Sequence, residues 1–232
     1  MLNFNDYLDN EEAINEGVYD KNIFKAFFLA GGPGSCKSWV SARTLMGQGM
    51  KVINSDDGFE RYAKQAGLNL KQMGAFTAKQ TKLKDRLRTR AKRGTAYMHQ
   101  HAIDCRLGLI MDSTARDTAR IEAEAQSMRY LGYDTYMVFV NTTLEVALKR
   151  NELRPRSVPE PIVINSHRQI QKNIPKLKAI FGTKSFVEVD NSVEAEDVNI
   201  KVYKEIQKLV RSKPSSPQAK AWIEAELAKK RR

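Results

Sequence analysis

A lysine and a serine close a glycine-rich stretch in which Gly31-Gly32-Pro33-Gly34-Ser35-Cys36-Lys37-Ser38 follows the pattern Gly-x4-Gly-Lys-Ser/Thr at all but one position. In a loop of this kind, backbone N–H groups surround a β-phosphate. The lysine reaches the β- and γ-phosphates, and the serine hydroxyl binds Mg²⁺. The alternative is an ordinary strand-to-helix turn, which would leave Lys37 at a helix N-terminus, where anions are preferred. The sequence therefore predicts an ATP site made by Gly31, Gly32, Gly34, Ser35, Cys36, Lys37 and Ser38, with Ser38 also binding Mg²⁺.

Cys36 stands where the pattern has its second glycine. Glycine is favoured there if the loop needs a positive φ or a close backbone approach. A cysteine held in such a conformation costs on the order of 1–3 kcal/mol, which weakens binding without abolishing the site. Two interpretations stay open: a tolerated substitution, and a redox switch based on an oxidisable thiol beside a phosphate.

Three further polar clusters follow apolar runs. They are Asn54-Ser55-Asp56-Asp57, Asp112-Ser113-Thr114 and Asn141-Thr142-Thr143. Each cluster taken alone could simply cap a helix. In open α/β sheets, however, ligands bind beyond the carboxyl ends of the strands. We therefore expect these clusters to lie beside the phosphate loop.

The elements that would position these residues alternate between strand and helix periods along the chain. Short apolar runs predict strands over 24–30, 50–56, 107–112, 133–141 and 185–191. Amphipathic segments between them predict helices, and residues 58–106 read as helical and basic. This alternation indicates a parallel sheet with helices on both faces. Together with the phosphate loop, it predicts an α/β P-loop NTPase three-layer sandwich with five strands and a basic helical insertion after the second.

The ordered set "GGPGSCKS", "NSDD", "LIMDST" and "ALKRNELRPRSVPE" resembles the P-loop kinase module of polynucleotide 5′-hydroxyl kinases. It is similar also to the related zeta-toxin-type kinases, and proteins of this kind are common in phage genomes. The resemblance covers roughly residues 25–191. It implies that Asp56 is the base that takes the proton from the acceptor hydroxyl, and that Asp112 organises the acceptor or the metal.

The resemblance also assigns Arg150 and Arg154 to a lid that neutralises charge on the transferring phosphoryl group and the leaving ADP. With Lys37 of the phosphate loop and Asp56, these arginines are the expected catalytic residues. Without the resemblance, the two arginines are an (i, i+4) pair on a helix surface. The chain departs from the family at Cys36 and at Phe59, where the family has an arginine that helps to hold the acceptor strand. Both departures bear on whether phosphate transfer is retained.

Charge is distributed unevenly. The net charge is +12, yet residues 1–20 hold six acids and no Lys or Arg, which leaves about +18 on residues 21–232. Such a field attracts polyanions. Residues 79–93 carry eight cations and one acid, and as a helix they would align Lys82, Arg86, Arg90 and Arg93 on one side. We expect Arg86 and Arg90 to contact an acceptor backbone, although a solvated helix face would need no partner.

The chain is expected to divide into three segments. We expect an acidic arm over 1–22, a kinase domain over 23–212 with an insertion (58–106) and a lid (150–160), and a linker with a basic helix over 213–232. No apolar run has the length of a membrane span. Two cysteines with 68 residues between them and the lack of signal-peptide features predict a cytoplasmic protein. The sequence leaves the oligomeric state open.

Three functions remain open at this stage. The first is an ATP-dependent kinase, using ATP and Mg²⁺, that phosphorylates a hydroxyl of a nucleic acid or nucleotide. The second is a zeta-toxin-type kinase of a nucleotide sugar or other small metabolite. The third is a non-catalytic P-loop protein that binds nucleotide to order a nucleic-acid-binding or partner-binding surface.

Overall fold

All five expected strands form one parallel sheet in the computed structural model, which describes residues 18–20, 22–45, 49–153, 158–192 and 196–231. The sheet order is β2-β3-β1-β4-β5. The strands are β1 (Lys25–Ala30), β2 (Lys51–Ile53), β3 (Leu109–Asp112), β4 (Asp134–Asn141) and β5 (Phe186–Asp190). β1 lies between β3 and β4, so the connection from β3 to β4 crosses over the central strand. The expected α/β class is confirmed.

Helices connect the strands and follow the last one, as expected. They are α2 (Lys37–Thr44), α3 (Ser55–Gln65), η1 (Leu70–Ala75), α4 (Ala78–Asp104), α5 (Thr118–Tyr130), α6 (Leu144–Glu152), α7 (Glu160–Phe181), η2 (Thr183–Ser185), α8 (Glu196–Arg211) and α9 (Pro217–Lys230). In the described part of the chain, none of these helices is long and apolar enough to cross a lipid bilayer.

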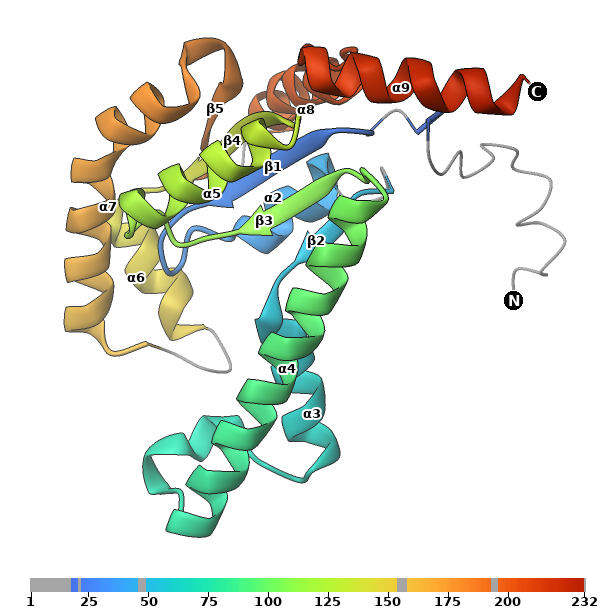
Figure 1. Ribbon diagram of the computed structural model, residues 1–232. Helices are drawn as coiled ribbons and strands as arrows, with labels where there is room; N and C mark the ends of the chain where they lie inside the picture. The colour runs from blue at the N-terminus through green and yellow to red at the C-terminus, as the bar shows by residue number, and fades with distance from the viewer. Residues whose placement is uncertain (1–17, 21, 46–48, 154–157, 193–195, 232) are drawn as a thin grey trace, which may run out of the picture.

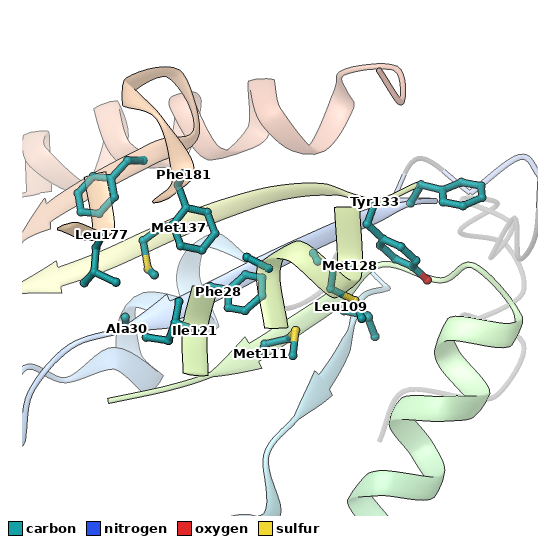
Figure 2. Close-up of a cluster of buried hydrophobic side chains, with 14 of the residues drawn as sticks. Phe28, Ala30, Leu109, Met111, Ile121, Met128, Tyr133, Met137, Leu177 and Phe181 are labelled. Carbon is teal, nitrogen blue, oxygen red and sulfur yellow. The ribbon is translucent and has the colours of Figure 1, made fainter. Parts of the chain in front are cut away.

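Alternate side chains of β1 enter two separate cores. Phe28 and Ala30 belong to a core with α5 and α7, whereas Phe27 and Leu29 belong to a core with α2 and α8. Figure 2 shows the first core, where side chains of the sheet meet those of α5 and α7. Since successive strand residues point to opposite faces, this partition gives helix, sheet and helix as three layers (Figure 1). α9 also packs on the first core, through Ala219 and Trp222.

The segment after β2 departs in detail from the expected strand and insertion. β2 ends at Ile53, and α3 begins at Ser55 because the Asn54 side chain accepts a hydrogen bond from the Asp56 N–H and caps the helix. Asp56 therefore lies with Asp57 in the first turn of a helix, and not at the end of the strand that was expected over 50–56. α3 returns through η1 into the long α4, and these three helices, here called the arm, extend away from the β2 edge of the sheet (Figure 1).

Candidate active site

The phosphate loop joins β1 to α2 and is held by its own hydrogen bonds. Ser35 donates from its N–H and its Oγ to the carbonyl of Gly32, at 3.2 and 2.8 Å. Lys37 Nζ donates to the Gly31 carbonyl at 2.8 Å, so the lysine lies over the loop. No side chain caps α2 and no acid lies in its first turn, whereas side chains cap α3, α4, α5 and α6. The start of α2, where Ser38 is exposed, is therefore suited to an anion.

Two loop glycines are required by close packing. A Cβ at Gly34 would lie 2.3 Å from the Ala147 carbonyl of α6, and φ at Gly34 is 77°. A Cβ at Gly31 would lie 2.6 Å from the Val140 carbonyl of β4. No other residue fits either position without moving the backbone of α6 or β4. The loop shape is thus fixed by its neighbours as well as by its own sequence.

Cys36 has the backbone conformation that favours glycine. Its φ is 58° and its ψ is 41°, which is left-handed, and it is the residue directly before α2. The side chain is exposed, and Sγ lies 3.8 Å from the Gly34 carbonyl. The cysteine therefore keeps the loop shape at an energetic cost of about 1–3 kcal/mol.

Asn54 links the polar ends of β2 and β3. While its Oδ1 caps α3, its Nδ2 donates to Asp112 Oδ2 at 3.1 Å. One amide side chain thereby fixes the position of the Asp56 backbone relative to the Asp112 carboxylate. Asp56, Asp57 and Asp112 are all exposed. They form a cluster of acids at the edge of the sheet where the phosphate loop begins.

The pKa of Asp112 links this acidic cluster to the phosphate loop. Partial removal from water raises the pKa of the Asp112 carboxyl above its usual range. The charge of Lys37 opposes this shift, and the charges of Asp56 and Asp57 add to it. These effects place Lys37, Asp56 and Asp57 within electrostatic reach of Asp112. The structure thus brings together Lys37 at the start of α2, Asp56 in the first turn of α3 and Asp112 at the end of β3.

Arg150 reaches the phosphate loop through a residue that sequence reasoning missed. Its guanidinium donates to the Asn191 carbonyl at 2.6 Å, and Asn191 Nδ2 donates to the Ser35 carbonyl at 2.9 Å. Asn191 is buried and directly follows β5. Polar residues follow this fifth strand as they follow the other four, and that pattern could have identified Asn191 from the sequence. Arg154, the second expected lid arginine, lies outside the described residues.

The expected basic face is present on the arm. An open groove of about 940 Å³ is lined by Phe76, Ala78, Thr81, Lys82, Asp85, Arg86, Thr89, Arg90 and Arg93. Arg86 and Arg90 are exposed, and the Arg90 guanidinium lies 4.7 Å from the centre of the Tyr62 ring. This groove lies on α4 and not over the phosphate loop.

Comparison with known protein families adds a decisive observation. The Zeta toxin family model matches residues 15–208, a stretch that includes the phosphate loop, the acidic cluster and Arg150. The chain belongs to the Zeta toxin family. The match ends before α9, which packs on the core but lies outside the Zeta toxin region. No curated protein matches the sequence.

Solved structures share this Zeta toxin fold at low sequence identity. One is AvrRxo1-ORF1:AvrRxo1-ORF2 with sulphate ions, with 14% identity and a TM-score of 0.54, covering 87% of this chain and 76% of that chain. Another is from the PezAT chromosomal toxin-antitoxin system of Streptococcus pneumoniae, with 14% identity and a TM-score of 0.51, covering 88% and 91%. A third is the Pnkp1/Rnl/Hen1 RNA repair complex, with 17% identity and a TM-score of 0.50. This chain is covered over 67% of its length there but spans only 46% of that chain. At these identities the likeness establishes the fold alone, which is that of P-loop kinases.

Proposed function

We propose that this protein is an ATP-dependent kinase that transfers the γ-phosphate to a hydroxyl of a nucleic acid or nucleotide. One observation carries the proposal: Asn54 hydrogen bonds both to the Asp56 backbone and to the Asp112 carboxylate, and the charge of Lys37 in the phosphate loop acts on Asp112. A phosphate donor site and a set of carboxylates that can accept a proton are thereby combined. Phosphoryl transfer requires this combination.

The donor half of the site binds ATP through its phosphates. Backbone N–H groups of the loop and of the start of α2 surround the β-phosphate, and Lys37 reaches the β- and γ-phosphates. The Ser38 hydroxyl and the Asp112 carboxylate are oxygen donors of the kind that Mg²⁺ prefers. When bound there, Mg²⁺ neutralises charge between the β- and γ-phosphates.

The acceptor half supplies the base. Asp56 takes the proton of the acceptor hydroxyl while the hydroxyl oxygen of the acceptor attacks the γ-phosphorus. The bond from that phosphorus to the β–γ bridging oxygen breaks, and ADP leaves with the electron pair. Arg150 neutralises charge that develops on the transferring group, with Arg154 as its partner in the lid. Its contact with Asn191, and through Asn191 with Ser35, supports this role because it holds the arginine at the loop.

The arm supports a polyanionic acceptor. Arg86, Arg90 and Lys82 line a groove that also contains an aromatic ring, Phe76. Cations that follow a backbone and rings on which bases stack are the usual components of single-strand binding sites. A small acceptor needs no cationic helix of this length.

Family membership supports a second candidate, a kinase of a nucleotide sugar or other small metabolite. Left-handed Cys36 and buried Phe59 support a third, a non-catalytic P-loop protein. γ-Labelled ATP distinguishes the three candidates when it is offered with 5′-hydroxyl oligonucleotides and with a panel of nucleotide sugars. Label on the oligonucleotide supports the kinase proposed here, and label on a sugar supports the second candidate. Transfer to neither, by a protein that binds ATP through Lys37, supports the third, with Lys37→Ala as the binding control.

A further inference from the structure

The candidate base contacts a residue of the basic helix. The Arg88 guanidinium of α4 donates a hydrogen bond to Asp56 Oδ1 and forms an ion pair with it. Asp56 begins α3, so this contact spans the two long helices of the arm. The cationic helix is therefore connected directly to the acidic cluster.

The ring of Phe59 packs against the Arg88 guanidinium. Arg88 Cζ lies 5.1 Å from the centre of the Phe59 ring, and Phe59 is 3% exposed. A ring fixed in the core holds a stacked guanidinium flat and limits its rotation. Because stacking uses only one face, the edge of the guanidinium that does not meet Asp56 still has N–H donors to offer.

The ion pair is too accessible to be explained by stability alone. The Arg88 side chain is 37% exposed and the Asp56 side chain 60% exposed. Exposed pairs contribute about 0–1 kcal/mol to folding. A planar, pre-oriented guanidinium with unused donors is, in contrast, well suited to a phosphate, which it can bind through two parallel hydrogen bonds.

We propose that Arg88 binds the acceptor phosphate nearest to the accepting hydroxyl and so places that hydroxyl against Asp56. One edge of the guanidinium meets the carboxylate and another meets the phosphate, so the two anions are held at a fixed separation. The site then selects hydroxyls that have a phosphate close by, at the end of a nucleic-acid strand or in a small nucleotide, over uncharged alcohols. This inference rests on the proposed function, because it concerns the acceptor of that reaction.

Equilibrium binding in the presence of ADP tests the inference without any need for turnover. The probes are a fluorescent 5′-hydroxyl trinucleotide, the same trinucleotide with a neutral methylphosphonate linkage nearest its 5′ end, and uridine diphosphate glucose. Wild type should bind the charged trinucleotide ten- to a hundredfold more tightly than the neutral one, the range of a charge-assisted hydrogen bond. Arg88→Ala should reduce this ratio to near one. Arg88→Lys should retain part of it, because the charge remains but the two-pronged geometry is lost.

Arg211→Ala is the matched control, since it removes an exposed guanidinium from the end of α8, a helix that is not part of the arm (Figure 1). It should leave the ratio unchanged. If Arg88→Ala weakens only the binding of uridine diphosphate glucose, the phosphate contact is supported and its source is a small nucleotide. Two results would overturn the inference. The first is that wild type binds both trinucleotides equally and that Arg88→Ala leaves the affinity for uridine diphosphate glucose unchanged. The second is that Arg88→Ala keeps the full ratio of the two trinucleotide affinities. Failure of phosphate transfer in the labelled-ATP assay would instead overturn the kinase function and leave this binding result intact.

Discussion

At the scale of single residues, Cys36 and Asp56 show how the site differs from a standard phosphate loop. Cys36 adopts a left-handed conformation because the adjoining loop is fixed by Gly34 against α6. Asp56 is held by the Asn54 cap and is paired with Arg88. The phosphate loop is therefore strained at Cys36, and Asp56 is oriented by a contact that comes from another helix.

Replacing Cys36 by glycine should relieve the strain in the loop. Glycine adopts φ near 58° without a Cβ penalty, so we expect Cys36→Gly to tighten ATP binding about tenfold, equivalent to about 1.4 kcal/mol. Calorimetric titration with ATP measures this. Cys36→Ala is the control, because it removes the thiol but keeps the Cβ. If the alanine and glycine variants bind ATP equally well, the thiol and not the backbone is the source of any difference.

Removing the negative charge of Asp56 should separate binding from turnover. We expect Asp56→Asn to bind ATP normally and to transfer phosphate at least about 10²-fold more slowly, because the base is lost. Asp57→Asn changes a neighbouring acid of the same helical turn and should slow transfer far less. Single-turnover rates at saturating ATP measure both variants. Equal rates for wild type and Asp56→Asn would exclude Asp56 as the base.

At the scale of elements, the sequence predicted the sheet well because its strands contain short apolar runs. β1 and β4 are buried along most of their length, and the structure places β1 in the centre of the sheet with β4 beside it. The boundary after β2 was wrong by three residues, because an Asn54 cap ends the strand early. Cap geometry is a local hydrogen bond that apolar periodicity does not encode.

Contacts between distant segments were beyond sequence reasoning. Arg88 is one cation among eight in its segment, and helical spacing leaves it off the side on which Arg86 is aligned with three other cations. Only the packing of α4 on α3 brings Arg88 to Asp56 and to the Phe59 ring. Asn191 is similar, since its link to Ser35 depends on how β5 lies in the sheet. The position of the phosphate loop between a strand and a helix could be predicted from the sequence, but the contacts of Arg88 and Asn191 could not.

Salt dependence tests the groove on the arm. If single-stranded nucleic acid follows it, oligonucleotide affinity should fall steeply as salt rises. Neutralising Arg86 and Arg90 together should reduce the slope of log K against log salt by about 1.4, from about 0.7 for each charge on a single strand. A double variant of the exposed Lys204 and Lys220, on α8 and α9, is the control and should keep the wild-type slope. An affinity that does not change with salt would favour a small-metabolite acceptor.

At the scale of the whole molecule, a strongly basic chain gathers three acids at its candidate site. The net charge of +12 favours polyanionic ligands, while Asp56, Asp57 and Asp112 repel one another and any phosphate that approaches. Lys37 offsets part of this repulsion, and a bound cation would offset more. The cluster is therefore a place where function opposes folding stability.

The pH dependence of stability should reveal this opposition. The pKa of Asp112 is raised in the folded state above its value of 3.8 in an unperturbed chain, chiefly by desolvation. The folded protein thus binds this proton more readily than the unfolded one, so stability falls as pH rises from 3.8 through the folded pKa.

Asp112→Asn cannot ionise and can still accept the Asn54 hydrogen bond through its Oδ1. We expect this variant to have the larger free energy of unfolding at pH 7, and the gain to shrink as pH is lowered towards 4. Urea unfolding at a series of pH values measures the difference, with Glu224→Gln, an exposed acid on α9, as a control that should show none. A gain that is the same at every pH would mean that Asp112 destabilises the fold through its packing and not through its charge.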